Sequence, residues 1–322
     1  FNALEVLWDP LQFLYLAELY LLFMLPFFFA ALCIGLAFTA RPGLVGRIYF
    51  ADLLGAGLGA AIVIGMLFLL QPQRAVLGLA AMALAASMLA RQRRSASRNR
   101  LLALAQFAWL LVLLYALPQD RIGLRISEFK GLSQALEVID ARVLAERSGP
   151  LGLLTVVESP RVPFRHAPGL SLATRQLPPD QLAVFTDGDG MSMINRVTGA
   201  PEELKFLEDV TTALPYRLLE RPRVLVLGAG AGSDVLLALH NGAERVEAVE
   251  LSPQMIGLVR ADFAAYAGNL YEHERVSLHH AEARGFVARQ SARYDLVQVA
   301  LLDSFAVSGS GVQALGESYL YT

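Results

Sequence analysis

A glycine-rich stretch in the last third of the chain is the first place where residue types and spacing can do chemistry. VLVLG (224–228) is a continuous apolar run of the kind that forms a buried parallel strand. Gly228, Gly230 and Gly232 lie at its end and beyond it, and VLLAL (235–239) then begins an apolar helix. Glycines permit a tight turn and let a ligand approach the backbone, and a helix N-terminus favours polar or anionic groups. The stretch therefore predicts a strand, a ligand-binding turn and a helix.

An acidic residue about 20 positions later narrows the class of ligand. RVEAVELS (245–252) indicates a second strand that ends in Glu250, where a carboxylate can accept hydrogen bonds from both hydroxyls of a ribose. The dinucleotide fingerprint G-x-G-x-x-G would need glycine where Ser233 stands. The pattern G-x-G-x-G that is found here is common in folds that bind S-adenosylmethionine (AdoMet). A purely structural turn between strand and helix is the alternative.

The alternation of strand and helix continues after Glu250. A helix capped by Ser252 and two further strands, the second of which ends in Asp303, are predicted at 252–266, 275–283 and 294–305. Strands that alternate with helices form a parallel, doubly wound sheet, and ligands bind at the carboxyl ends of its strands. We expect one cleft to contain the groups that lie at those ends, namely Gly228, Gly230, Gly232, Glu250, Glu282 and Asp303.

The first third of the chain is almost continuously apolar, with four segments at about 11–38, 48–70, 75–90 and 101–117. The first two have the length of a membrane-spanning helix, and the last two are short. Arginines gather at 41–47 and 91–100, so the positive-inside rule places both breaks in the cytosol. Four spans would then put the rest of the chain outside the cytosol, whereas AdoMet-type ligands are cytosolic. We give the ligand precedence and expect a cytosolic domain on a multi-pass protein of the bacterial inner (plasma) membrane. In that case either 101–117 does not cross or one of the short segments is re-entrant.

Composition divides the chain into three predicted parts: transmembrane helices, about four, at 1–118; a small β-hairpin domain at 119–200; and a Rossmann-like AdoMet-binding domain at 201–322. DGDG (187–190) reads as a turn, since the spacing and terminal glutamate of a calcium loop are absent. A helix is predicted from about 201 to Leu214, before Pro215. The last domain stops after its fourth strand, so we expect the native protein to continue.

The overall charge and the metal-ligating residue types exclude several functions. A net charge of −2 argues against a nucleic-acid partner, because binding phosphates needs a basic surface. Cys33 is the single cysteine and lies in an apolar run, so it cannot build a disulfide or a cysteine metal site alone. His279 and His280 lack further ligands at suitable spacing, so they are read as structural and no metal is expected.

Several stretches together resemble the spermidine/spermine synthase family, the polyamine aminopropyltransferases, and in particular its bacterial variants in which such a domain follows a transmembrane region. The stretches that carry the resemblance are GRIYFADLLGAGLGA, RSGPLGLLTVVES, VFTDGDG, VLVLGAGAGSDV, VEAVELSP, HAEARGF, YDLVQVALLDSF and ESYLYT. The resemblance implies decarboxylated AdoMet as the aminopropyl donor and a polyamine as the acceptor.

The resemblance also implies roles for particular residues. Glu250 matches the ribose-binding acid, and Glu282 falls where the family has an aspartate near the adenine. Asp303 matches the first aspartate of D-S-x-D-P, which holds the attacking amine and accepts its proton. Asp187, in the turn that matches the L-D-G motif, and Asp209 are placed on the substrate side.

The chain departs from the family pattern on the side of the polyamine. The family turn G-G-G-D-G reads GAGAG here, so Ala231 replaces an acid, and D-S-x-D-P reads DSFAV. The Tyr-His-Glu motif appears as LED (207–209), and the glutamine after L-D-G corresponds to Met191. These changes weaken the expectation of a polyamine acceptor more than that of a nucleoside donor.

Three functions from two classes remain open from the sequence. The leading one is a membrane-anchored transferase that binds AdoMet or decarboxylated AdoMet and moves an aminopropyl group to a small-molecule amine. The second is an AdoMet-dependent methyltransferase on the same fold. The third is a non-catalytic sensor module or subunit of a membrane complex. The lipid bilayer is an expected partner in each case, and a homodimer is a further possibility.

Overall fold

The computed structural model describes residues 5–89, 96–116, 126–200 and 202–300, which form two compact units. The first unit consists of Phe1–Arg125 with Ser148–Pro150, and the second of Ile126–Arg147 with Leu151–Thr322. The sequence divides the second stretch into a β-hairpin domain and a nucleoside-binding domain, and the structure groups these two parts in a single unit.

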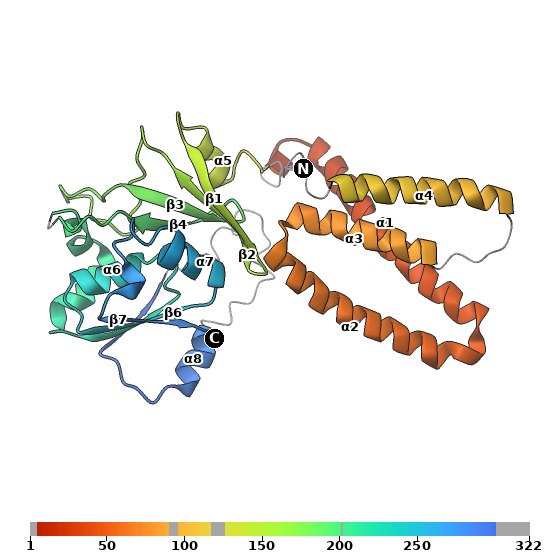
Figure 1. The fold of residues 1–322 in the computed structure, drawn as a ribbon. Coiled ribbons are helices and arrows are strands. Elements are labelled where there is room, and N and C mark those ends of the chain that lie inside the picture. The colour runs from red at the N-terminus through yellow and green to blue at the C-terminus, as the bar shows by residue number, and fades with distance from the viewer. Residues whose placement is uncertain (1–4, 90–95, 117–125, 201, 301–322) are drawn as a thin grey trace. The chain divides into compact units, whose positions relative to one another are not determined.

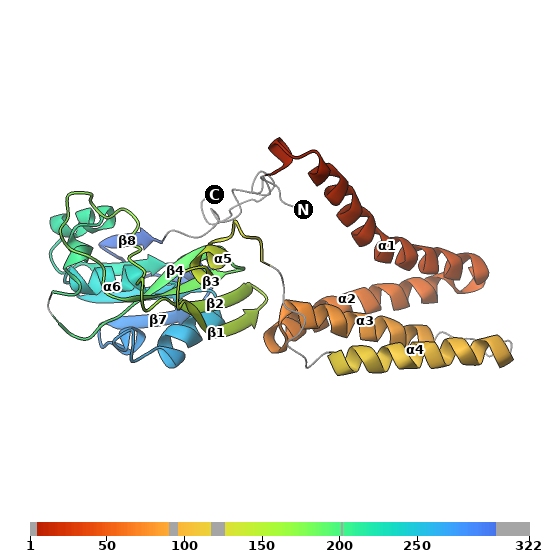
Figure 2. The same cartoon turned by 90° about the horizontal axis from the view of Figure 1, so that it is seen from above.

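The first unit is helical (Figure 1). Its long helices are α1 (Leu11–Ala40), α2 (Val45–Leu69), α3 (Pro72–Leu89) and α4 (Ala96–Ala116), with short 3-10 turns at Glu5–Leu7 and Pro42–Leu44. The helices α3 and α4 lie side by side in both views (Figure 2). The predicted helical character of this region is confirmed.

Three of these helices are long and apolar enough to cross a membrane: α1, α2 with the turn before it, and α3. Large apolar side chains on α1 are exposed, for example Phe23 at 66% and Phe27 at 76%. Apolar surface on this scale is typical of helices that face lipid or a partner. In α4 the described apolar stretch is the shorter Leu104–Leu113, so the fourth predicted span stays a prediction.

The second unit begins with an antiparallel sheet. After α5 (Gly131–Leu136), the strands β1 (Arg142–Gly149), β2 (Gly152–Glu158), β3 (Gln181–Thr186) and β4 (Gly190–Asn195) pair in the order β1-β2-β3-β4. One face buries Val157, Phe185 and Met193 under α5, and the other packs toward the parallel sheet. The hairpins predicted from the β-branched runs are therefore present.

The segment predicted as a helix up to Leu214 forms two 3-10 turns instead, η3 (Lys205–Glu208) and η4 (Thr211–Leu218). The backbone between them bonds across to another loop: Ser171 N–H donates to Asp209 O, and Thr211 N–H donates to Gly169 O. These bonds take groups that an α-helix would use internally, and Pro215 lacks the N–H that a longer helix needs. Tertiary pairing therefore prevents the predicted helix.

The C-terminal part of the described chain is a parallel sheet in the order β7-β6-β5-β8. Its strands and α-helices run in the sequence β5 (Arg223–Leu227), α6 (Ser233–His240), β6 (Arg245–Glu250), α7 (Pro253–Gly257), β7 (Val276–His280), α8 (Ala283–Arg289) and β8 (Leu296–Val299). The predicted alternation is present, although the single helix expected at 252–266 is a short α7 followed by a π-helical turn, η5 (Leu258–Asp262). Asp303 lies outside the described residues.

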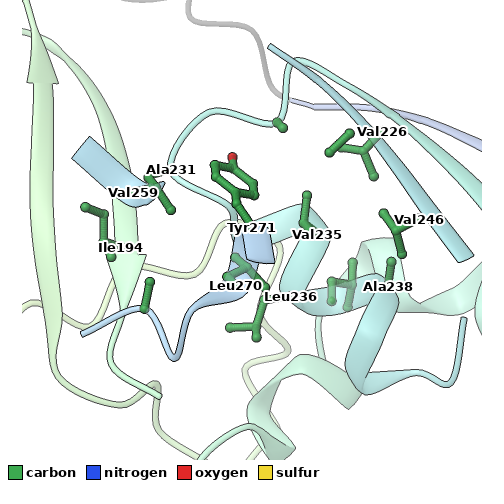
Figure 3. Close-up of a cluster of buried hydrophobic side chains, with 14 of the residues drawn as sticks. Ile194, Val226, Ala231, Val235, Leu236, Ala238, Val246, Val259, Leu270 and Tyr271 are labelled. Atoms are coloured by element: carbon green, nitrogen blue, oxygen red, sulfur yellow. The ribbon is translucent and has the colours of Figure 1, made fainter. Parts of the chain in front are cut away.

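Alternate residues of β5 face the two sides of this sheet. Val224 and Val226 pack toward α6, together with Val246 of β6, and Leu225 and Leu227 pack against Phe286 of α8. Helices therefore cover both faces, as in a doubly wound sheet. Figure 3 shows the larger cluster, in which side chains of α6 lie between Ile194 of β4 and the parallel sheet. This packing brings the two sheets to a shared boundary.

Candidate functional site

A cavity of about 340 Å³ lies at this boundary within the second unit. Its lining comes from β4, from the loop around His166, from the glycine turn after β5, from the first turns of α6, and from the ends of β6 and β8. Its size is at the lower end of the range for small-molecule sites. Its position outside the carboxyl ends of the parallel strands is where ligands bind in such sheets.

The three glycines of the turn have two different tasks. Gly228 and Gly230, with φ of 80° and 54°, line the cavity. Gly232, with φ of 96°, is not part of the lining, and a Cβ there would stand 2.4 Å from Leu270 Cδ2. Tyr271, which does not line the cavity, holds the turn in place, because its buried hydroxyl donates to Gly230 O at 2.8 Å. Two glycines therefore open the backbone to the cavity, and the third permits packing.

Glu250 ends β6 at the edge of the cavity. Its Oε2 accepts a hydrogen bond from Gly230 N at 2.8 Å, and its Oε1 accepts one from Ser252 N at 2.7 Å. Ser252 in turn caps α7, since its hydroxyl accepts from Met255 N at 3.2 Å. Each carboxylate oxygen keeps an acceptor position after these bonds. The carboxylate is thus held in place beside the glycine turn and can accept hydroxyl donors from a ligand.

Asp234 is a second acid on the cavity, and the sequence patterns did not single it out. It lies in the first turn of α6, where an acidic side chain is common because it interacts favourably with the helix dipole, so its position in the sequence does not indicate a ligand site. Gln298 of β8 donates to its Oδ1, and Tyr216 donates to Gln298 Oε1 at 2.8 Å. Burial raises the pKa of Asp234, and the hydrogen bond from Gln298 partly offsets that rise. Only the pairing of β8 beside β5 reveals that this acid faces a cavity.

A polar network joins the hairpin sheet to the glycine turn. Asn195 donates to Ser233 Oγ at 3.1 Å, and Ser233 Oγ donates to Met193 O at 3.1 Å. Gln181 donates to Asn195 Oδ1 at 2.8 Å and to His166 O at 2.9 Å. Burial lowers the pKa of the His166 side chain, which favours its neutral form. The hairpin sheet therefore supplies one wall of the cavity, a role that the sequence did not predict.

Three other predicted site residues do not line this cavity. Glu282 caps α8, where it accepts from Arg284 N at 2.8 Å and Gly285 N at 2.6 Å, and these bonds lower its pKa. Asp187 holds the β3–β4 turn at φ 51°, with Leu153 N donating to its Oδ1 at 2.9 Å. Asp209 accepts a hydrogen bond from Thr174 Oγ1 and lines a separate, more open hollow. Their ligand roles, like that of Asp303, stay predictions.

Comparison with known proteins matches residues 208–312 to the spermine/spermidine synthase domain. A search of curated proteins found no match. Among solved structures, a spermidine synthase in complex with the transition-state analogue AdoDATO is similar, with 18% identity, TM-score 0.37, and coverage of 53% of this chain and 50% of that one. A spermidine synthase from Thermotoga maritima is similar at 17% identity, TM-score 0.37, and coverage of 52% and 49%.

This chain spans about half the length of those two solved structures. The matched segment begins in η3, contains the glycine turn, Glu250 and the whole parallel sheet, and so includes the strand ends that border the cavity. Residues 208–312 therefore match the spermine/spermidine synthase domain family.

Proposed function

We propose that this chain binds decarboxylated AdoMet or AdoMet in the cavity and transfers the aminopropyl group of the decarboxylated donor to an amine. The observation that carries the proposal is Glu250, which two backbone N–H groups hold at the end of β6 beside Gly230 on the cavity wall. In this position its remaining acceptor sites suit the two hydroxyls of a ribose. The family match of the same segment supports a transferase of this kind.

The chain's own residues have separate tasks in such a transfer. Gly228 and Gly230 let the ligand approach the backbone, and Glu250 orients the ribose. The amine nitrogen then attacks the methylene carbon next to the sulfonium, the carbon–sulfur bond breaks, and its electron pair stays on sulfur to give a neutral thioether. The amine must lose one proton, and we assign its acceptance to the carboxylate of Asp303 by the family resemblance.

Methyl transfer is a second candidate, which the substitutions on the polyamine side favour. Ala231 and Met191, at positions where the family has an acid and a glutamine, both line the cavity. An acceptor other than a polyamine fits this lining. Product analysis with each donor separates the two reactions, because aminopropyl transfer releases methylthioadenosine and methyl transfer releases S-adenosylhomocysteine.

The first test is calorimetric titration of the full chain in detergent with decarboxylated AdoMet and with AdoMet. Glu250→Gln should weaken the binding of either nucleoside about 10- to 100-fold, because a hydrogen bond to a charged group contributes about 1.5–3 kcal/mol. The matched control is Glu244→Gln, an exposed glutamate just before β6 that does not line the cavity. Equal affinities for wild type and Glu250→Gln would argue against the proposal, as would the absence of nucleoside binding.

The apolar helices motivate a proposal about location. The three helices that are long and apolar enough to cross a membrane support a multi-pass protein of the bacterial inner membrane. We place the second unit in the cytosol, because AdoMet-type donors are found there. A homodimer or a larger membrane complex is compatible with the same chain.

A further inference from the structure

The described lining of the cavity contains acidic side chains and no basic side chain. Among the described residues of the lining, the carboxyl groups are Asp234 and Glu250, and no lysine or arginine is present. His166 is the one other ionisable side chain in that lining, and burial favours its neutral form. A partly buried carboxylate without a cationic partner is costly. A cationic ligand would supply the missing charge.

The surroundings of Asp234 fix how its carboxyl is presented. Tyr216 donates its hydroxyl proton to Gln298 Oε1, so the amide nitrogen of Gln298 faces Asp234 and donates to Oδ1. Burial raises the pKa of Tyr216, so its hydroxyl stays protonated and remains a donor. Within the described part of the chain, Asp234 Oδ2 has no hydrogen-bond partner. The relay therefore orients the acid and leaves an acceptor oxygen for a ligand.

The apolar part of the lining limits which cation fits. Phe206 and Leu207 of η3 and Leu237 of α6 line the cavity together with Asp234. An alkylammonium group, whose methylenes pack on such side chains while its N–H groups reach a carboxylate, matches this combination. A carboxylate-bearing ligand would instead meet like charge from both acids.

We propose that Asp234 is the anionic contact for a primary ammonium group of the ligand in this cavity, on the aminopropyl arm of the donor or on the acceptor amine. The identity of that ligand rests on the proposed function. The same contact makes the site selective for decarboxylated AdoMet over AdoMet, because the carboxylate of AdoMet is repelled by Asp234 and Glu250.

The test is calorimetric titration of the full chain in detergent with four probes: decarboxylated AdoMet, AdoMet, neutral methylthioadenosine and 1,4-diaminobutane. The variants are Asp234→Asn, which keeps an oxygen for the Gln298 bond, and Asp234→Glu, which keeps the charge. The control is Asp140→Asn, which removes an equal charge from an exposed ion pair with Arg161 and suits the positive φ of 64° there.

We expect Asp234→Asn to weaken decarboxylated AdoMet, 1,4-diaminobutane or both at least tenfold, while methylthioadenosine binds within about twofold of wild type. The probe that loses affinity identifies the molecule whose ammonium is bound. Asp234→Glu should recover part of the loss, and Asp140→Asn should change nothing. The preference for decarboxylated AdoMet over AdoMet should shrink in Asp234→Asn.

Two results would overturn this assignment: cationic probes that bind Asp234→Asn as tightly as wild type, or methylthioadenosine losing affinity by the same factor as the cations. If wild type binds no nucleoside but binds 1,4-diaminobutane through Asp234, the nucleoside function fails and the ammonium contact stands. If wild type binds nucleosides without any dependence on Asp234, the nucleoside function stands and the ammonium contact fails. A wild type that binds none of the four probes overturns both.

Discussion

At the scale of the residue, the partly buried Asp234 on α6 links the stability of the fold to pH. Desolvation raises the pKa of Asp234 in the folded chain above its ordinary value of 3.8. The neighbouring titratable groups are Tyr216 and Tyr271, whose pKa values burial also raises, and Glu250. The tyrosines stay neutral, so none of these neighbours supplies a positive charge. A ligand cation would offset the same cost that burial imposes on the free protein.

The raised pKa of Asp234 makes the stability of the fold fall as pH rises. The folded chain holds the proton of Asp234 to higher pH than the unfolded chain, so wild type loses stability as pH rises from about 3.8 through the folded-state pKa. Asp234→Asn lacks this titration. Its free energy of unfolding, relative to wild type, should therefore rise through that window and level off above it.

The measurement is urea unfolding of the full chain in detergent between about pH 3.5 and pH 8. Asp140→Asn is again the matched variant, because it removes an exposed carboxylate, and its difference from wild type should not follow the Asp234 window. A stability difference between Asp234→Asn and wild type that stays flat over the whole range would contradict the prediction.

At the scale of the element, the cavity depends on how the hairpin sheet is joined to α6. Asn195 ends β4 with 6% exposure and bonds both to Gln181 on β3 and to Ser233 at the start of α6. The helix α6 therefore contacts the hairpin sheet through Asn195 and packs on the parallel sheet with its apolar side chains. The bond fixes the first turn of α6, which also carries Asp234.

Asn195→Ala should destabilise the second unit by about 1–3 kcal/mol, because it removes one of the two acceptors of the buried Gln181 amide and leaves one of its N–H groups unpaired. We also expect weaker nucleoside binding, since Gly230 and Asp234 lie on the turn and helix that this bond positions. Urea unfolding, with proteolysis as the readout of the unfolded fraction, measures the loss of stability. Gln290→Ala, an exposed position at the end of α8, is the control. Equal midpoints for the two variants would show that the bond does not couple the elements.

At the scale of the whole molecule, the proposed membrane location requires the second unit to lie on one side of the bilayer. We predict the cytosol, because that is where AdoMet-type donors are found. Cys33 is the single cysteine, so Cys33→Ser gives a thiol-free background for Ser291→Cys at an exposed position between α8 and β8. A membrane-impermeant maleimide should label this variant in inverted inner-membrane vesicles and not in intact cells.

The thiol-free chain without Ser291→Cys controls for background labelling, and carbonate extraction checks that the chain stays in the membrane. Labelling in intact cells alone would place the unit outside the cytosol and remove the argument for a cytosolic donor. That outcome would favour the arginine count of the sequence, which points to the opposite side.

The sequence by itself determined the apolar helices, the hairpins, the glycine turn and the strand that ends in Glu250. Each of these follows from local periodicity, turn residues and capping, which a short window of sequence encodes. The 3-10 turns before β5 were missed, because their backbone bonds to a distant loop around Gly169 and Ser171.

Only the tertiary structure decided which side chains meet at the cavity. Asp234 and Asn195 join it because β8 pairs beside β5 and because α6 packs between β4 and the parallel sheet. Glu282, Asp187 and Asp209 do not line the cavity. Glu282 caps α8, Asp187 accepts from Leu153 N, and Asp209 accepts from Thr174 Oγ1. Spacing along the chain places an acid at a strand end or in a helix turn, whereas long-range pairing decides whether that acid faces a ligand.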